Sequence, residues 1–145
     1  NERIIIDDIN GNSVNYRKYL TYYWNNKDKV GFKLKNIEHL RLVISYPINR
    51  NILPIYQEFT HLKSLEIYLH VYLGISELCQ NIKCDNIHTF KVCYNGDDYA
   101  CIDGFNSIIK QATNIWLSGC LITKSVINAL NKPIINSLNI GNVIV

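Results

Sequence analysis

Apolar residues return in this chain at a fixed interval of 25 residues, and this periodicity limits its possible folds more than any other feature. Each period carries apolar residues at positions spaced as 1, 4, 7 and 9. The sets are Leu34, Ile37, Leu40 and Leu42; Phe59, Leu62, Leu65 and Ile67; Cys84, Ile87, Phe90 and Val92; Ile109, Ala112, Ile115 and Leu117; and, after a shorter step of 23 residues, Ile135, Leu138 and Ile140. Such a period predicts repeated units that stack, because one unit cannot bury its apolar side alone.

The last two apolar positions of each set are separated by a single residue, which is the alternation of a β-strand. In the first set, Leu40 and Leu42 should point into the core while Arg41 points out. Strands from successive units can then join into one parallel sheet. We expect the inward positions of all five strands to be almost fully buried, including Leu138 and Ile140 in the last one.

This L-x-x-L-x-L pattern, in units of about 25 residues, resembles the leucine-rich repeat. The resemblance covers roughly residues 34–145. It implies an α/β fold: a leucine-rich-repeat solenoid with a parallel β-sheet on the concave face and short helices or turns on the convex face. Residues 1–33 do not follow the period.

The fourth unit, N-I-W-L-S-G-C-L-I-T over residues 114–123, resembles the cysteine-containing repeat familiar from F-box substrate receptors. In that subtype the cysteine, here Cys120, turns inward at the end of the strand, and the threonine, here Thr123, opens a helix. The other units depart from the subtype. Where Cys120 stands in the fourth unit, they carry Ser45, His70 and Asn95.

The segments between strands carry helix signals. Pro54 predicts a helix that begins near Leu53, because proline fits the first turn of a helix. Gly74 precedes a short turn over residues 75–82, with Leu78 facing inward. Asp103 is placed to cap a helix through Ile108 and Ile109, and Thr123 to cap one that contains Val126, Ile127 and Leu130.

Both ends of the chain carry expectations of their own. Residues 3–6 should form a strand, and Ser13 should cap an amphipathic helix from Val14 to about Trp24 that covers the first repeat or is itself a degenerate repeat. The last strand, placed at residues 140–145, should have an open edge. We therefore expect further repeats beyond residue 145, a docked partner, or self-association through this edge. Since the sequence contains no methionine, it should be a trimmed piece.

Composition excludes several classes of protein. No window of about 18 apolar residues predicts a membrane span, and the acidic opening residues are unlike a secretory signal. The net charge is +3, and the basic residues are scattered along the chain, so they form no nucleic-acid or membrane patch.

The five cysteines form no C-x2-C pair and are odd in number, so we expect free thiols, with Cys84 and Cys120 buried. Without any N-x-[ST] acceptor, the sequence favours an intracellular, cytoplasmic protein.

No pattern of residues predicts catalysis. The four histidines belong to no nucleophile motif, and Asp97, Asp98 and Asp103 lack the spacing of a calcium loop. No glycine-rich phosphate loop is present. We expect no enzyme activity, no cofactor and no metal site.

The candidate site is the outward face of the predicted sheet. Its central column should read Arg41, Glu66, Lys91, Trp116 and Asn139, with Tyr68 beside it. Two interpretations stand side by side: solvated cross-strand charges that contribute little, or a protein-binding surface with aromatic anchors. The favoured function is a non-enzymatic interaction module that binds a protein partner, including the recognition part of an F-box-like adaptor. The alternatives are a structural segment of a larger solenoid or assembly, and an extracellular recognition receptor.

Overall fold

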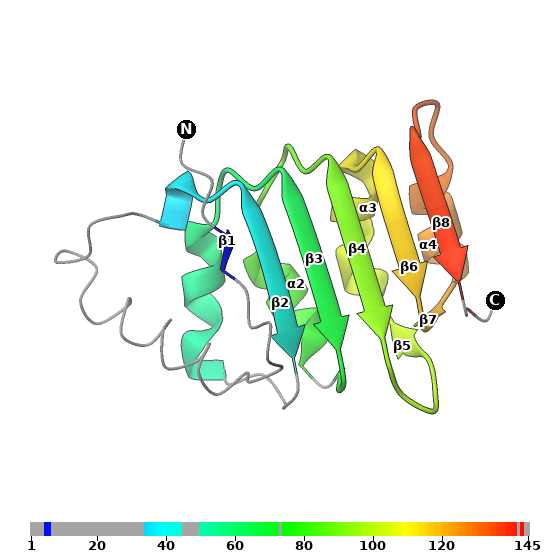
Figure 1. Ribbon diagram of the computed structural model, residues 1–145, viewed down its shortest axis with the longest axis horizontal. Helices are drawn as coiled ribbons and strands as arrows, with labels where there is room; N and C mark the ends of the chain where they lie inside the picture. Colours follow the sequence, from blue (N-terminus) through cyan, green and yellow to red (C-terminus); the bar gives the residue numbers. More distant parts are fainter. Residues whose placement is uncertain (1–4, 7–33, 45–49, 73, 142, 144–145) are drawn as a thin grey trace, which may run out of the picture.

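The chain folds into a main parallel β-sheet with helices on one of its faces (Figure 1). The computed structural model describes residues 5–6, 34–44, 50–72, 74–141 and 143. Its six-stranded sheet has the order β1-β2-β3-β4-β6-β8, so the chain adds each strand beside the preceding one. The strands are β1 (Ile5–Ile6), β2 (His39–Ile44), β3 (Ser64–Leu69), β4 (Thr89–Tyr94), β6 (Asn114–Ser118) and β8 (Ser137–Gly141). A second sheet pairs β5 (Ala100–Cys101) with β7 (Cys120–Leu121).

The sheet register confirms the columns expected from the sequence. Leu40 lies beside Leu65, Leu65 beside Phe90, and Phe90 beside Ile115, each 25 residues further along the chain. The backbone hydrogen bonds at the start of β3, β4, β6 and β8 also repeat. At each start, one carbonyl accepts hydrogen bonds from two consecutive amides of the next unit. The accepting carbonyls belong to Glu38, Lys63, His88 and Thr113.

The core lies between the sheet and the helices, and the inward columns fill it. The inward residues of β2, β3, β4 and β6 are buried as expected, and Phe90 is completely shielded from solvent. Leu138 and Ile140 in β8 contradict the expectation, since they are 46% and 41% exposed. They continue the inward columns, but no described strand lies beyond β8 to cover them.

Short helices connect the strands. They are the 3-10 helices η1 (Leu34–Asn36), η2 (Arg50–Glu58) and η3 (Asp103–Phe105), and the α-helices α2 (Ile75–Asn81), α3 (Asn106–Gln111) and α4 (Lys124–Leu130). The expected start near Leu53 is wrong, because η2 begins at Arg50 and holds Pro54 in its interior. Gly74 precedes α2 and Leu78 is buried, as the sequence predicted. The structure adds that Gly74 adopts the left-handed conformation.

The two predicted caps behave differently. Thr123 caps α4 as expected, because its hydroxyl accepts a hydrogen bond from the backbone N–H of Val126 at 3.2 Å. Asp103 makes no cap hydrogen bond, because a 3-10 turn precedes α3. Its carboxylate instead accepts a hydrogen bond from the Thr123 hydroxyl at 2.6 Å, which joins two successive units.

Other side chains also link neighbouring units through the backbone. The Gln111 amide donates to the carbonyl of Cys84 at 2.8 Å and accepts from the N–H of Ile87 at 2.9 Å. The Lys132 ammonium donates to the carbonyls of Ile109 and Ala112, at the C-terminal end of α3. There a positive charge is favourable, because the last carbonyls of a helix lack partners within it.

At the ends of the chain the structure describes only part of what the sequence predicts. The two-residue strand β1 pairs in parallel with His39 and Leu40 of β2. The predicted helix over residues 14–24 lies outside the described residues. The last strand is Ser137–Gly141 and therefore begins before the predicted residue 140. None of the described helices is long and apolar enough to cross a membrane.

All five cysteines are free thiols, and they differ in exposure. Cys84 and Cys120 are buried as expected, Cys79 is buried as well, and Cys101 is exposed. Burial raises the pKa of Cys120 to about 12 and raises the pKa of Cys84. Both thiols should therefore stay protonated at mildly alkaline pH. Since alkylation requires the thiolate, they should react slowly in the folded chain.

We expect iodoacetamide to modify Cys101 first in the native protein, and Cys84 and Cys120 only after unfolding. Peptide mass spectrometry of a time course with and without denaturant measures the order of modification. The intact mass of the non-reduced chain provides the control. A mass lower by about two hydrogens would reveal a disulfide and favour a secreted protein.

Candidate interaction face

The candidate site is the face of the sheet opposite the helices, which is turned toward the viewer in Figure 1. Since side chains alternate along a strand, every second residue of each strand projects from this face. The register aligns these residues in three columns across the sheet. The columns are His39, Ser64, Thr89, Asn114 and Ser137; Arg41, Glu66, Lys91, Trp116 and Asn139; and Val43, Tyr68, Cys93, Ser118 and Gly141.

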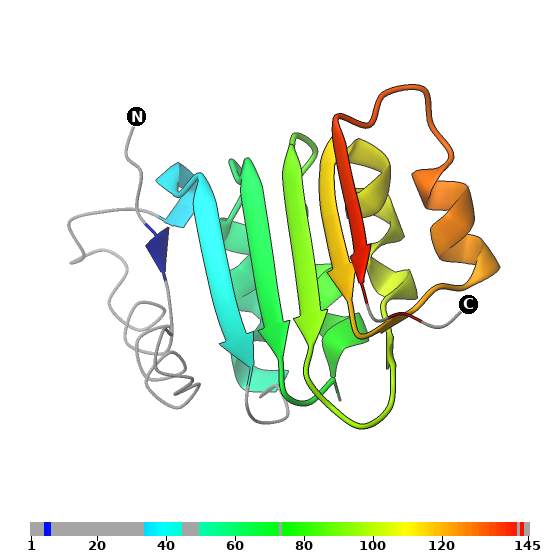
Figure 2. The same cartoon turned by 45° about the vertical axis from the view of Figure 1, so that its right-hand side comes forward.

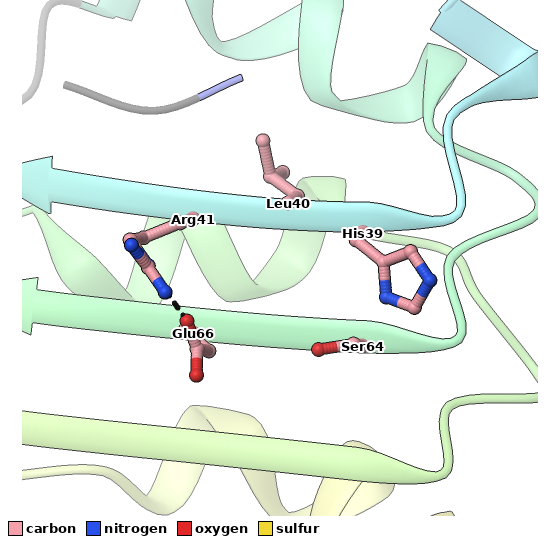
Figure 3. A pocket seen from close by; sticks show the side chains of 5 residues that line it. All are labelled: His39, Leu40, Arg41, Ser64 and Glu66. Carbon is pink, nitrogen blue, oxygen red and sulfur yellow. Dashed lines mark hydrogen bonds and ion pairs between the residues drawn. The ribbon is translucent and has the colours of Figure 1, made fainter. Parts of the chain in front are cut away.

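Arg41 and Glu66 form an ion pair at one side of this face. Nε of Arg41 donates to Oε2 of Glu66 at 2.7 Å, between neighbouring strands (Figure 3). A shallow pocket of about 210 Å³ lies here, lined by His39, Leu40, Arg41, Ser64 and Glu66. Since the ion pair is partly exposed, it should add little to stability, but it orients the guanidinium and carboxylate.

Lys91 stands between two aromatic rings in the middle of the face. Its ammonium lies 4.1 Å from the centre of the Trp116 ring and 5.2 Å from that of Tyr68. Both distances are within the range of cation–π attraction, worth about 0.5–1 kcal/mol at an exposed site. Burial lowers the pKa of Lys91, but the hydrogen bond to Tyr68 and the electrostatic interactions with Tyr68, Cys93 and Glu66 outweigh this effect, so the pKa is raised overall. Lys91 is therefore charged at neutral pH.

Trp116 is the one large hydrophobic residue of these columns that is exposed in the described part of the chain, at 43%. The Lys91 ammonium lies over its ring, and this cation–π contact favours the present orientation of the indole. Asn139, its neighbour in the same column, is exposed on the adjoining strand. The centre of the face thus offers an exposed indole beside a charged ammonium, a combination that suits binding.

A second polar cluster lies at the carboxyl ends of the strands. The hydroxyls of Tyr72 and Tyr94 donate to the two carboxylate oxygens of Asp98 at 2.7 and 2.5 Å, and their rings meet edge to face. The hydrogen bond to Asp98 raises the pKa of Tyr94 to about 12 and raises that of Tyr72. The same bonds, that from Tyr94 first, lower the pKa of Asp98. The cluster fixes the loop between β4 and β5.

The structure places all six predicted site residues in neighbouring outward columns and brings two groups of them into contact. Arg41 meets Glu66, and Lys91 meets both Tyr68 and Trp116. Sequence reasoning missed the Tyr–Asp–Tyr cluster. Its one signal is the position of Tyr94, which is in register with the apolar Leu69 yet carries a hydroxyl.

In comparisons with known proteins, no family model, no curated protein and no solved structure matches this chain. Within the described ranges, no group of three or more His, Cys, Asp or Glu side chains could hold a metal ion.

Proposed function

We propose that the chain is a leucine-rich-repeat solenoid and acts, without catalysis, as a binding module for a protein partner. Three features support the repeat architecture: the 25-residue register, the recurring hydrogen bonds at strand entry, and the order in which strands are added. Cys120 is buried and Thr123 caps α4, as the cysteine-containing subtype implies. These two features favour an F-box-like adaptor, an intracellular protein, as the sharper form of the proposal.

The observation that carries the binding function is the exposed Trp116, which lies beside Lys91 in a largely polar face. A large aromatic side chain brings much contact area for few rotatable bonds. An anchor already positioned in the free protein loses less conformational entropy on binding. Trp, Tyr and Arg are also the residues most enriched among those that dominate protein interfaces.

The charges of the face indicate what kind of partner surface would fit. The charge of Arg41 is balanced by Glu66. For Lys91, no carboxylate of the described residues lies within ion-pair distance. A matching partner would offer an apolar pocket for Trp116 with an acidic side chain at its border. The acidic group would mainly accelerate association and make it sensitive to salt.

Replacing both aromatic residues, Tyr68→Ala and Trp116→Ala, should abolish capture of a specific partner. We expect each residue to contribute about 2 kcal/mol to binding, as interface anchors do. The measurement is a pull-down from source cells with quantitative mass spectrometry, followed by titration of the identified partner. Lys91→Ala should instead slow association and weaken its dependence on salt.

A matched control carries Gln80→Ala and Ile127→Ala, two exposed positions on the helices. It should capture the partner as the wild-type chain does, and circular dichroism should show that all variants fold. If the aromatic double variant kept the same partners, the binding site would lie outside this face and the proposal would be wrong.

A further inference from the structure

Strand β8 forms the outer edge of the described six-stranded sheet. Beyond β8 the described sheet contains no further strand (Figure 2). The strand reads Ser-Leu-Asn-Ile-Gly and carries no charge. Protein edge strands are usually protected by charged residues, proline or a covering segment. Strand β8 contains no charged residue and no proline. Its inward residues Leu138 and Ile140 are 46% and 41% exposed, although the aligned Ile115 and Leu117 of β6 are buried.

The hydrogen bonds of β8 show which backbone groups are left for a partner. The N–H of Ser137 donates to the carbonyl of Thr113, so the polar backbone groups of Ser137 point toward β6. Backbone direction alternates along a strand. The N–H and C=O groups of Leu138 and Ile140 therefore point away from β6, toward the open edge.

We propose that two copies of this chain pair antiparallel through β8, about a two-fold axis that passes beside Asn139. The strand is nearly symmetric around this residue, with an aliphatic side chain on each side and a small residue beyond. Leu138 of one copy then forms two backbone hydrogen bonds with Ile140 of the other copy. By the two-fold symmetry, Ile140 of the first copy forms the same two bonds with Leu138 of the second. Asn139 meets Asn139 of the second copy as a non-hydrogen-bonded pair, the type in which side chains come closest.

This arrangement also covers the exposed apolar residues. An axis perpendicular to the sheet places the helices of both copies on the same face of a continuous sheet. Leu138 and Ile140 of both copies then lie in one layer and extend the core across the axis. An interface built on one short strand falls at or below the small end of specific complexes, about 1,200 Å² in total, so we expect a dissociation constant that is micromolar or weaker.

Sedimentation velocity of the 145-residue chain tests the proposal, from low micromolar to millimolar concentration and with reductant present. The wild-type chain should pass from monomer to dimer and stop there. Asn139→Lys and Asn139→Asp each place like charges opposite one another across the axis, so each should weaken dimerisation at least tenfold. An equimolar mixture of the two variants should dimerise again, because the introduced charges are then opposite.

Gln80→Lys adds the same charge at an exposed position of α2 and should leave dimerisation unchanged. Several results would overturn the proposal. A wild-type chain that stays monomeric shows that the edge does not pair, and dimerisation unaffected by Asn139→Lys shows that another surface is used. Growth beyond the dimer indicates head-to-tail contact. Failure of the mixture to dimerise contradicts the two-fold register.

Discussion

Truncation of Phe90 to alanine should lower the free energy of unfolding by about 3–5 kcal/mol, the range for large aromatic residues removed from a core. Phe90 is completely buried, and its ring centre lies 5.1 Å from that of Phe105, which is equally shielded. Phe90 belongs to the sheet and Phe105 to η3, so the substitution removes a contact between the sheet and the helical layer. Equilibrium unfolding in urea, with an unchanged dependence on denaturant, measures the loss.

Two variants serve as controls for this experiment. Phe90→Leu keeps most of the apolar volume and should cost clearly less than the alanine variant. Trp116→Ala changes the outward column of the sheet, where the side chain is 43% exposed, and should alter stability by under about 1 kcal/mol. If Trp116→Ala were as damaging as Phe90→Ala, the assignment of inward and outward columns would be wrong.

Gly119→Ala should lower the free energy of unfolding by about 2–5 kcal/mol. This loss combines the strain of a left-handed backbone at a residue with a Cβ and the steric overlap of that Cβ with its neighbours. Gly119 has a φ of +72°, which disfavours any residue with a Cβ. A Cβ built here would also lie 2.2 Å from the carbonyl oxygen of Tyr94, a backbone atom with little room to move. The turn between β6 and β7 would have to separate from β4 to accept alanine.

Gly141→Ala provides the matched control, because a Cβ at this position meets no atom within 4 Å. We expect its thermal and urea unfolding to resemble those of the wild-type chain. Comparable losses from the two substitutions would mean that the close approach of Gly119 to Tyr94 is absent in solution.

The sequence by itself determined the register of the sheet and the two faces of each strand. The 25-residue spacing aligns Leu40, Leu65, Phe90 and Ile115 in one column, and strand alternation places Arg41, Glu66, Lys91 and Trp116 on the opposite face. These features follow from local periodicity repeated along the chain, so no knowledge of distant contacts is needed. The cap of α4 by Thr123 is local in the same sense.

Only the tertiary structure decided the features that depend on neighbours distant in sequence. Asp103 has the chemistry of a helix cap, but it accepts a hydrogen bond from Thr123, which lies 20 residues away. Tyr72 and Asp98, 26 residues apart, meet because neighbouring units stack. Leu138 and Ile140 carry the same pattern as the buried columns and are nevertheless exposed. Burial of an inward position requires a covering unit as well as the right residue, and periodicity specifies only the residue.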